Sequence, residues 1–190
     1  MTPARKRIIL ASCCLSLLIV SMDATIVNVA IPSIRADLGA TASQLQWVID
    51  IYTLVLASLL MLSGAMGDRF GRRRVFQIGL TIFALGSLAC SLAPTIDTLI
   101  GARFLQGIGG SMLNPVALSI ISQIFSTPVE RARALGIWGG ITGISMAAGP
   151  IVGGLLGAAI YDFLIRNTLI ARGVKPKADV VEEGRTVIDE

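Results

Sequence analysis

The 190-residue chain contains no histidine. Imidazole is the side chain that most readily changes charge near neutral pH and is the commonest metal ligand, so acid–base or metal chemistry based on it is excluded. Any proton carried by this chain must therefore bind a carboxylate. The sequence also lacks a glycine-rich nucleotide-binding loop and a nucleophile paired with a base, so it predicts a protein that is not an enzyme and needs no cofactor.

Charged residues are scarce as well. They make up 15% of the chain against 54% hydrophobic residues, and the mean hydropathy is +0.77. A water-soluble fold could not bury that much apolar surface, so we expect the lipid bilayer to be the main partner. The net charge is +4, but the arginines lie at the ends of apolar runs, where they indicate membrane topology and not a nucleic-acid surface.

Cysteines are few and do not suggest a disulfide framework or a metal site. Cys13, Cys14 and Cys90 all lie inside apolar runs, their number is odd, and their spacing is not that of metal ligands. We therefore expect inert thiols that are packed or face lipid, with no disulfide network and no metal site.

Five apolar runs are long enough to cross a bilayer. They cover residues 8–31, 45–66, 75–93, 98–125 and 134 to about 165. The first run follows a basic N-terminus, as a signal peptide does, but it is longer than a signal core and lacks an obvious cleavage site. The sequence thus predicts an all-α integral membrane protein of about five transmembrane helices followed by a polar tail.

The connections between these runs alternate in charge. Basic residues gather before the first run, in the link Gly64–Arg74 and in the link 126–133, whereas the other two links carry one or none. By the positive-inside rule, the N-terminus and the basic links lie in the cytoplasm. We interpret Gly64–Arg74 as a short turn between two antiparallel helices.

Local signals predict where the helices end. We expect Pro32 to end the first helix, residues 41–44 to cap the second, and Asp97 or Thr98 to cap the fourth. Trp47 and Tyr52 lie near the outer end of the second run, which suits an aromatic belt at the membrane surface.

Ionisable residues inside the apolar runs are candidates for function, because a charge at bilayer depth is costly. Asp23 lies about 13 Å from Pro32 at helical rise, near the midplane, and the long side chain of Arg103 can reach the same depth. Asp23 is either a proton carrier or half of a fixed ion pair with Arg103, and the residues alone leave both open. We interpret Asp50 as an interfacial residue, and Asn28 either bonds locally or lines a cavity.

Glycines mark the faces of the last two runs, and we expect Gly107, Gly109 and Gly110 of the fourth run to let a neighbouring helix approach closely. Gly139 and Gly143 recur at intervals of four, as do Gly149 and Gly153, so we expect another helix to pack closely against them. Gly149 and Pro150 interrupt the hydrogen-bond ladder in mid-span and predict a hinge or a kink.

Five segments in order resemble motifs of the major facilitator superfamily, and more closely of its fourteen-helix drug/proton antiporter branch. The segments are Met22–Pro32, Trp47–Tyr52, Gly64–Arg74, Arg103–Gly110 and Gly139–Gly154. The resemblance implies proton-driven efflux of lipophilic or cationic drugs across a bacterial cytoplasmic membrane, with the proton gradient as the energy source. It implies that Asp23 and Arg103 couple proton and substrate, and that two glycine-containing motifs move. Those motifs are a conformational latch at Gly64, Asp68, Arg69, Gly71 and Arg72, and an antiporter hinge at Gly149, Pro150, Gly153 and Gly154.

The end of the chain departs from this pattern. Residues 1–157 correspond to a partial N-terminal transporter half, whereas residues 158–190 read as a divergent helix end and a charged, flexible tail that resembles an aquaglyceroporin C-terminus. The tail's basic residues also conflict with the outside location that five spans imply. We expect a truncated or fused exporter. The alternatives are a membrane fragment that transports nothing, and one that self-associates in place of the missing C-terminal half.

Overall fold

The computed structural model describes residues 2–160, with side chains for residues 2–148 and for Ile151. Over this range the chain forms five helices: α1 (Pro3–Leu38), α2 (Ala42–Phe70), α3 (Arg72–Ser91), α4 (Ile96–Ile124) and α5 (Pro128–Ile160). Helices α1 to α4 are long and apolar enough to cross a membrane. With 33 residues, α5 also exceeds the ~20 that a bilayer requires. The all-α membrane class is confirmed, and the predicted tail lies outside the described residues.

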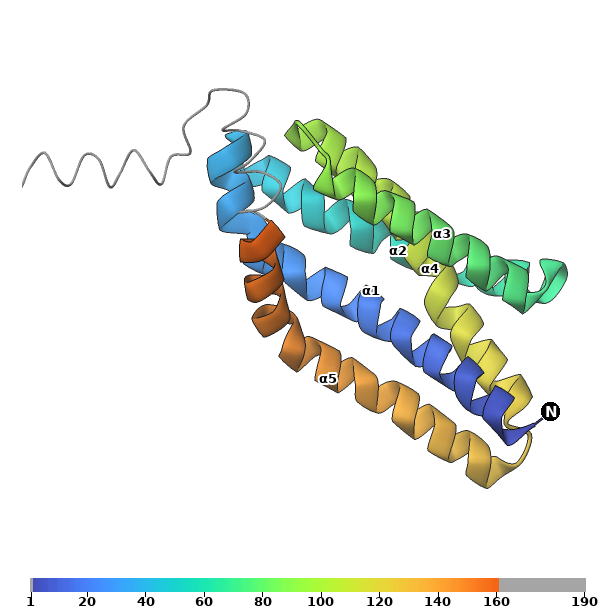
Figure 1. Cartoon of the computed structure of the whole chain (residues 1–190). Helices are drawn as coiled ribbons and strands as arrows, with labels where there is room; N and C mark the ends of the chain where they lie inside the picture. Colours follow the sequence, from blue (N-terminus) through green and yellow to red (C-terminus); the bar gives the residue numbers. More distant parts are fainter. Residues whose placement is uncertain (1, 161–190) are drawn as a thin grey trace, which may run out of the picture.

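Helix α4 forms the centre of the bundle. It packs against both α2 and α3, while α1 packs against α5 and also contacts α4, which joins the two groups (Figure 1). Glycines bring α3 and α4 into backbone contact: a Cβ placed on Gly86 would lie 2.8 Å from the Gln106 Cα, and one on Gly109 would overlap the Phe83 backbone. The predicted packing role of the α4 glycines is confirmed for Gly107 and Gly109, whose faces are covered.

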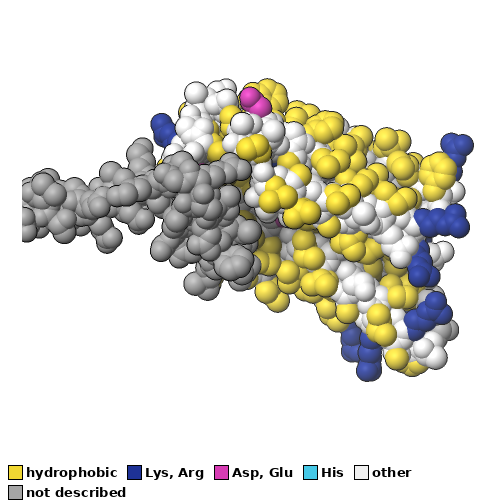
Figure 2. Space-filling view, turned by 45° about the horizontal axis from the view of Figure 1, so that its top comes forward, with side chains coloured by type: hydrophobic (Ala, Val, Ile, Leu, Met, Phe, Trp, Pro, Cys, Tyr) yellow, Lys and Arg dark blue, Asp and Glu magenta, His cyan; other side chains and the backbone are white. Residues whose placement is uncertain are grey.

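Lysine and arginine side chains collect at one end of the bundle (Figure 2). Helices α1, α3 and α5 begin at this end, and α2 and α4 finish there. Lys6 on α1 forms an ion pair with Glu130 on α5 across 3.2 Å, which closes the end of that helix pair. The basic links therefore share one end, as the sequence predicted, and we call it the basic end.

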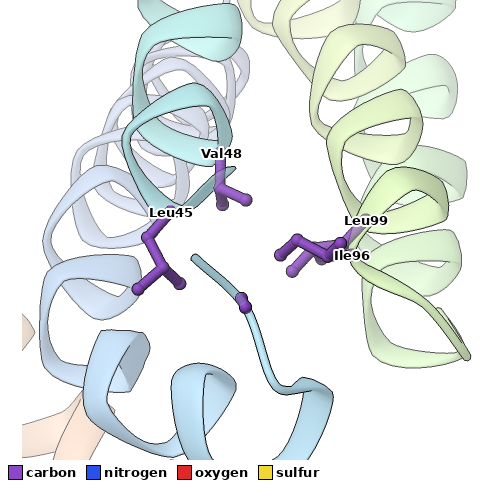
Figure 3. Close-up of a cluster of buried hydrophobic side chains, with 5 residues drawn as sticks. Leu45, Val48, Ile96 and Leu99 are labelled. Carbon is purple, nitrogen blue, oxygen red and sulfur yellow. The ribbon is translucent and has the colours of Figure 1, made fainter. Parts of the chain in front are cut away.

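The opposite end is held by a small apolar cluster. Figure 3 shows Leu45 and Val48 of α2 facing Ile96 and Leu99 of α4. The predicted cap of α2 is confirmed, because the Thr41 hydroxyl accepts a hydrogen bond from the Gln44 backbone N–H and the Gln44 Oε1 accepts one from the Thr41 backbone N–H. The predicted cap of α4 was wrong: Thr95, not Asp97 or Thr98, is the cap, and its hydroxyl accepts from the Thr98 N–H at 3.3 Å.

Two predicted helix ends were also wrong. Helix α1 continues through Pro32 to Leu38 and ends at Gly39, whose φ of 60° is left-handed. An internal proline removes only one N–H, so the chain can continue to the glycine, which caps a helix at little steric cost. The link Gly64–Arg74 is not a loop, because α2 runs to Phe70 and α3 starts at Arg72. Gly71 alone breaks the helices, with a φ of 94°.

The glycine face of α5 differs from the expectation. A Cβ on Gly139 or Gly143 would meet nothing within 4 Å, so no described residue packs closely against these two glycines. The backbone of α5 continues through Gly149 and Pro150 to Ile160 and changes direction in its last third (Figure 1). The side chains of Pro150 and its glycine neighbours lie outside the described residues, so their hinge role stays a prediction.

Candidate functional site

Asp23 and Arg103 meet inside the bundle. Arg103 Nη1 of α4 donates to Asp23 Oδ2 of α1 at 2.7 Å, and the two side chains are 4% and 18% exposed. Both residues lie in mid-helix, so the bond joins α1 to the central helix well away from either end. The pairing that the sequence suggested is present in the structure.

Gln106 completes the contacts of the carboxylate. Its Nε2 donates to Asp23 Oδ1 at 2.7 Å, and its Oε1 accepts from Arg103 Nη1 at 2.8 Å. The Cys90 thiol of α3 donates to the same Oε1, with the sulfur 3.6 Å away. Three helices thus share one hydrogen-bonded group, and we call Asp23, Arg103, Gln106 and Cys90 the buried network.

Helix α2 provides the remaining contacts of Arg103. The Nε donates to the Val48 carbonyl at 3.3 Å, and the guanidinium carbon lies 4.3 Å from the centre of the Tyr52 ring. Tyr52 is only 2% exposed, so its predicted place in an aromatic belt was wrong. The ring instead offers its negative face to the arginine, which helps to hold a positive charge away from water.

The side chains of Asp23 and Arg103 differ in their exposure, and this difference decides which of the two a ligand can reach. Arg103 is enclosed, and its guanidinium acts as a donor in every hydrogen bond that it makes. Asp23 keeps 18% of its side chain accessible, so its carboxylate is the member of the pair that a proton or a cationic ligand can reach. A buried charge that loses its partner is strongly destabilised, so any change at Asp23 is felt by Arg103.

Two predicted site residues are not part of the buried network. Asn28 is exposed and donates to the Ala24 carbonyl at 3.2 Å, which is the local bond that the sequence left open. Asp50 accepts from Gln46 on its own helix at 3.0 Å. Within the part of the chain that the structure describes, neither has a side-chain hydrogen bond to Asp23 or Arg103.

Two of the predicted latch residues, Asp68 and Arg72, meet at the basic end. Asp68 Oδ1 accepts hydrogen bonds from Arg72 Nη2 at 2.8 Å and from Arg72 Nε at 3.1 Å. Arg72 Nη1 donates to the Ser119 carbonyl of α4 at 3.0 Å. This arrangement connects the α2–α3 junction to α4. Arg69 points elsewhere and stacks on Phe70 at 5.5 Å, and Gly64 has open space beside it.

The sequence reasoning missed the roles of Gln106, Tyr52 and Cys90. Gln106 follows Arg103 by three residues, so the two share a face of α4, and this spacing was the available signal. The other two lie on α2 and α3, and the contacts between helices that bring them to Arg103 cannot be read from periodicity alone.

Comparison with known proteins identifies the family of the chain. A family model described as Major Facilitator Superfamily matches residues 13–171, so the match extends past Gly157, where we placed the boundary between the two segments. The puromycin resistance protein pur8 of Streptomyces alboniger is 45% identical over 139 residues, which cover 73% of this chain and 28% of pur8. The multidrug efflux pump LfrA of Mycolicibacterium smegmatis is 42% identical over 155 residues, covering 82% of this chain and 31% of LfrA.

A solved structure shares the fold. The crystal structure of a bacterial homolog of the human lysosomal transporter Spinster, in an inward-facing and unoccupied conformation, matches with a TM-score of 0.72. Its identity is 22%, over 92% of this chain and 36% of the solved chain. The chain spans about three tenths of the length of the curated relatives it matches. On the evidence of the family model, which covers most of its length, and of these relatives, the chain belongs to the major facilitator superfamily.

Proposed function

We propose that this chain is part of a proton-coupled exporter of lipophilic, often cationic, compounds. The observation that carries the proposal is the ion pair of Asp23 with Arg103, enclosed among apolar helices and more open on the aspartate side. Ionisable residues inside membrane proteins are rare and commonly belong to ion or substrate pathways. Asp23 supplies one negative charge that a proton and a cationic substrate can compete for.

The exchange follows from that competition. When Asp23 is charged, it holds Arg103 and Gln106 and can attract a cation; when it is protonated, that attraction is lost and the cation leaves. Loading the proton from one side and releasing it to the other makes the exchange directional. The proton gradient is then the energy source.

The names of the relatives support export. They include a puromycin resistance protein, a multidrug efflux pump and a methyl viologen resistance protein of Salmonella typhimurium. A riboflavin transporter, RibZ of Clostridioides difficile, is 36% identical over 152 residues, so similarity alone does not fix the substrate. We place the chain in a bacterial cytoplasmic membrane, with its basic end and N-terminus in the cytoplasm.

Movement is proposed at two places. At the basic end, the Asp68–Arg72–Ser119 contact joins α2 and α3 to α4 and forms the latch, which opens when these helices separate. In α5, Gly149 and Pro150 supply the hinge. Alternating access rocks one transporter half against the other around a site at the midplane.

A chimera tests the proposal. The matching segment of LfrA is replaced by this chain, and efflux of the fluorescent cation ethidium is measured in a bacterial strain that lacks its own exporters. We expect efflux that collapses when the proton gradient is dissipated and is lost in Asp23→Asn. Asp50→Asn is the matched control, because it neutralises an aspartate outside the buried network. Efflux that persists in Asp23→Asn would sink the assignment.

The same assay separates the alternative that this chain alone transports nothing. In that case the chimera expels ethidium, whereas the 190-residue chain expressed by itself does not. Efflux by the chain alone, with an oligomer detected by cross-linking, would instead support self-association.

A further inference from the structure

The orientation of the Gln106 amide is fixed by its charged neighbours. Its Nε2 faces the Asp23 carboxylate at 2.7 Å, and its Oε1 faces Arg103 Nη1 at 2.8 Å and the Cys90 thiol. The side chain is 1% exposed, so no water competes for these bonds. With Asp23 charged, the opposite orientation would set the amide oxygen against the carboxylate and the amide N–H groups against the guanidinium, and both contacts would be repulsive.

Protonation of Asp23 removes the reason for this orientation. The carboxylate takes its proton from water on the accessible side. The neutral acid then carries one O–H, which requires an acceptor. Arg103 is a donor only, and as the charged donor it retains the carbonyl oxygen of the acid. The O–H is therefore directed at Gln106, whose present Nε2 is also a donor. A half-turn of the amide brings Oε1 to the O–H and gives it an acceptor inside the bundle.

That half-turn changes contacts on two other helices. Arg103 loses the Gln106 oxygen and meets an N–H in its place, so it keeps the Val48 carbonyl and the Tyr52 ring. The Cys90 thiol of α3 also loses its oxygen acceptor. We propose that Gln106 is a positioning residue whose amide rotates when Asp23 is protonated and transmits the change from α1 to Arg103 on α4 and Cys90 on α3. Its use in transport rests on the proposed function, whereas the rotation itself does not.

Few other titratable groups approach this site. The groups that face Asp23 are Arg103 from α4, Tyr52 from α2 and Cys90 from α3. Asp50 of α2 is bonded to Gln46. The ionisable residues at the start of α5 (Glu130, Arg131 and Arg133) lie at the basic end, and Arg35 and Asp37 lie at the opposite end of α1. Among the described residues, Asp23 is thus the carboxylate that directs the Gln106 amide.

The Cys90 S–H stretching band in the infrared reports the rotation, because its frequency rises when a thiol loses its acceptor. The measurement uses the 190-residue chain in lipid vesicles and compares it with Asp23→Asn, which keeps the side chain neutral. Asparagine gives its oxygen to Arg103 and turns its NH₂ toward Gln106, so it demands the same rotation. We expect the Cys90 band to move to the position of an unbonded thiol. Cys90→Ala identifies the band, and the bands of Cys13 and Cys14 should not move.

Further variants separate rotation from loss of packing. Gln106→Met keeps the approximate volume but has no amide, so the Cys90 band should lie at the unbonded position with either Asp or Asn at position 23. Ser111→Ala is the control, because it removes a buried hydrogen bond between α4 and Ser63 of α2 at another place in the bundle. It should leave the shift of the Cys90 band unchanged. Should Asp23→Asn not fold, the Cys90 band of the unmodified chain is instead followed while the pH is lowered until all its carboxylates are protonated.

One result overturns the proposal: a Cys90 band that stays in place when Asp23 is neutral, in a chain whose circular dichroism remains helical. Because the measurement needs no transport, this result is independent of the ethidium assay. Loss of proton-coupled efflux with a shifted band would overturn the proposed function and leave the rotation standing.

Discussion

The energy of the Asp23–Arg103 pair can be measured with a double-mutant cycle. Asp23→Leu removes two bonds of 2.7 Å and leaves a guanidinium that is only 4% exposed without its counter-charge. Breaking a fully buried pair costs about 3–5 kcal/mol. Asp23 is partly accessible and Arg103 keeps the Val48 carbonyl and the Tyr52 ring, so we expect a loss of roughly 2–3 kcal/mol in the free energy of unfolding. Arg103→Met should cost a similar amount.

The double variant decides whether charge is responsible. Asp23→Leu with Arg103→Met leaves no unpaired charge, so its loss should be smaller than the sum of the single losses by about 2 kcal/mol. Neutral hydrogen bonds between membrane helices average only ~0.6 kcal/mol, which is clearly below this coupling. The assay is reversible unfolding in mixed detergent–lipid micelles, followed by circular dichroism. Single losses that add to within ~0.5 kcal/mol would refute the view that the two residues act as one unit.

Three further predictions concern packing, backbone and latch. Gly109→Ala should lower the free energy of unfolding by roughly 2–3 kcal/mol, because its methyl group would overlap the α3 backbone, whereas Gly101→Ala, beside open space, should change it by less than ~1 kcal/mol; equal effects would contradict the α3–α4 contact. Gly71→Ala should cost about 1–3 kcal/mol through its φ of 94° alone, so a neutral result in the same unfolding assay would argue against this junction. Asp68→Asn should lower the free energy of unfolding by less than ~1 kcal/mol, because Asp68 is 67% exposed. Arg72→Ala should lower it more, because the bond to Ser119 of α4 is also lost. The reverse order would show that the ion pair, and not the bond to α4, holds this end.

Much of the fold could be predicted because apolar length and arginine position are local signals. The basic links share one end as expected. Each long apolar helix carries the chain from one end of the bundle to the other, so alternate links lie at the same end. The errors fell where two local rules compete. Pro32 was read as a stop, but a proline inside a long membrane helix removes one bond among many, and the chain ends α1 only at Gly39.

The candidate site could be predicted in part. Asp23 and Arg103 stand out because charges are rare in apolar runs, and their similar depth indicated a pair. Gln106 and Tyr52 do not stand out, because an uncharged polar residue in a helix can face lipid, a neighbour or a cavity. Their roles depend on which helices α4 touches, and that information lies in contacts across the sequence and not in any one segment. Asp50 was considered for the same reason as Asp23, but its side chain bonds to Gln46, one turn earlier on α2.

The central claim is that Asp23 exchanges a proton for substrate. The direct measurement is proton release from the purified LfrA chimera in weakly buffered detergent solution when a cationic substrate such as ethidium is added. We expect release of up to one proton per bound substrate from the chimera, and none from Asp23→Asn. Equal proton release from the chimera and from Asp23→Asn would contradict it.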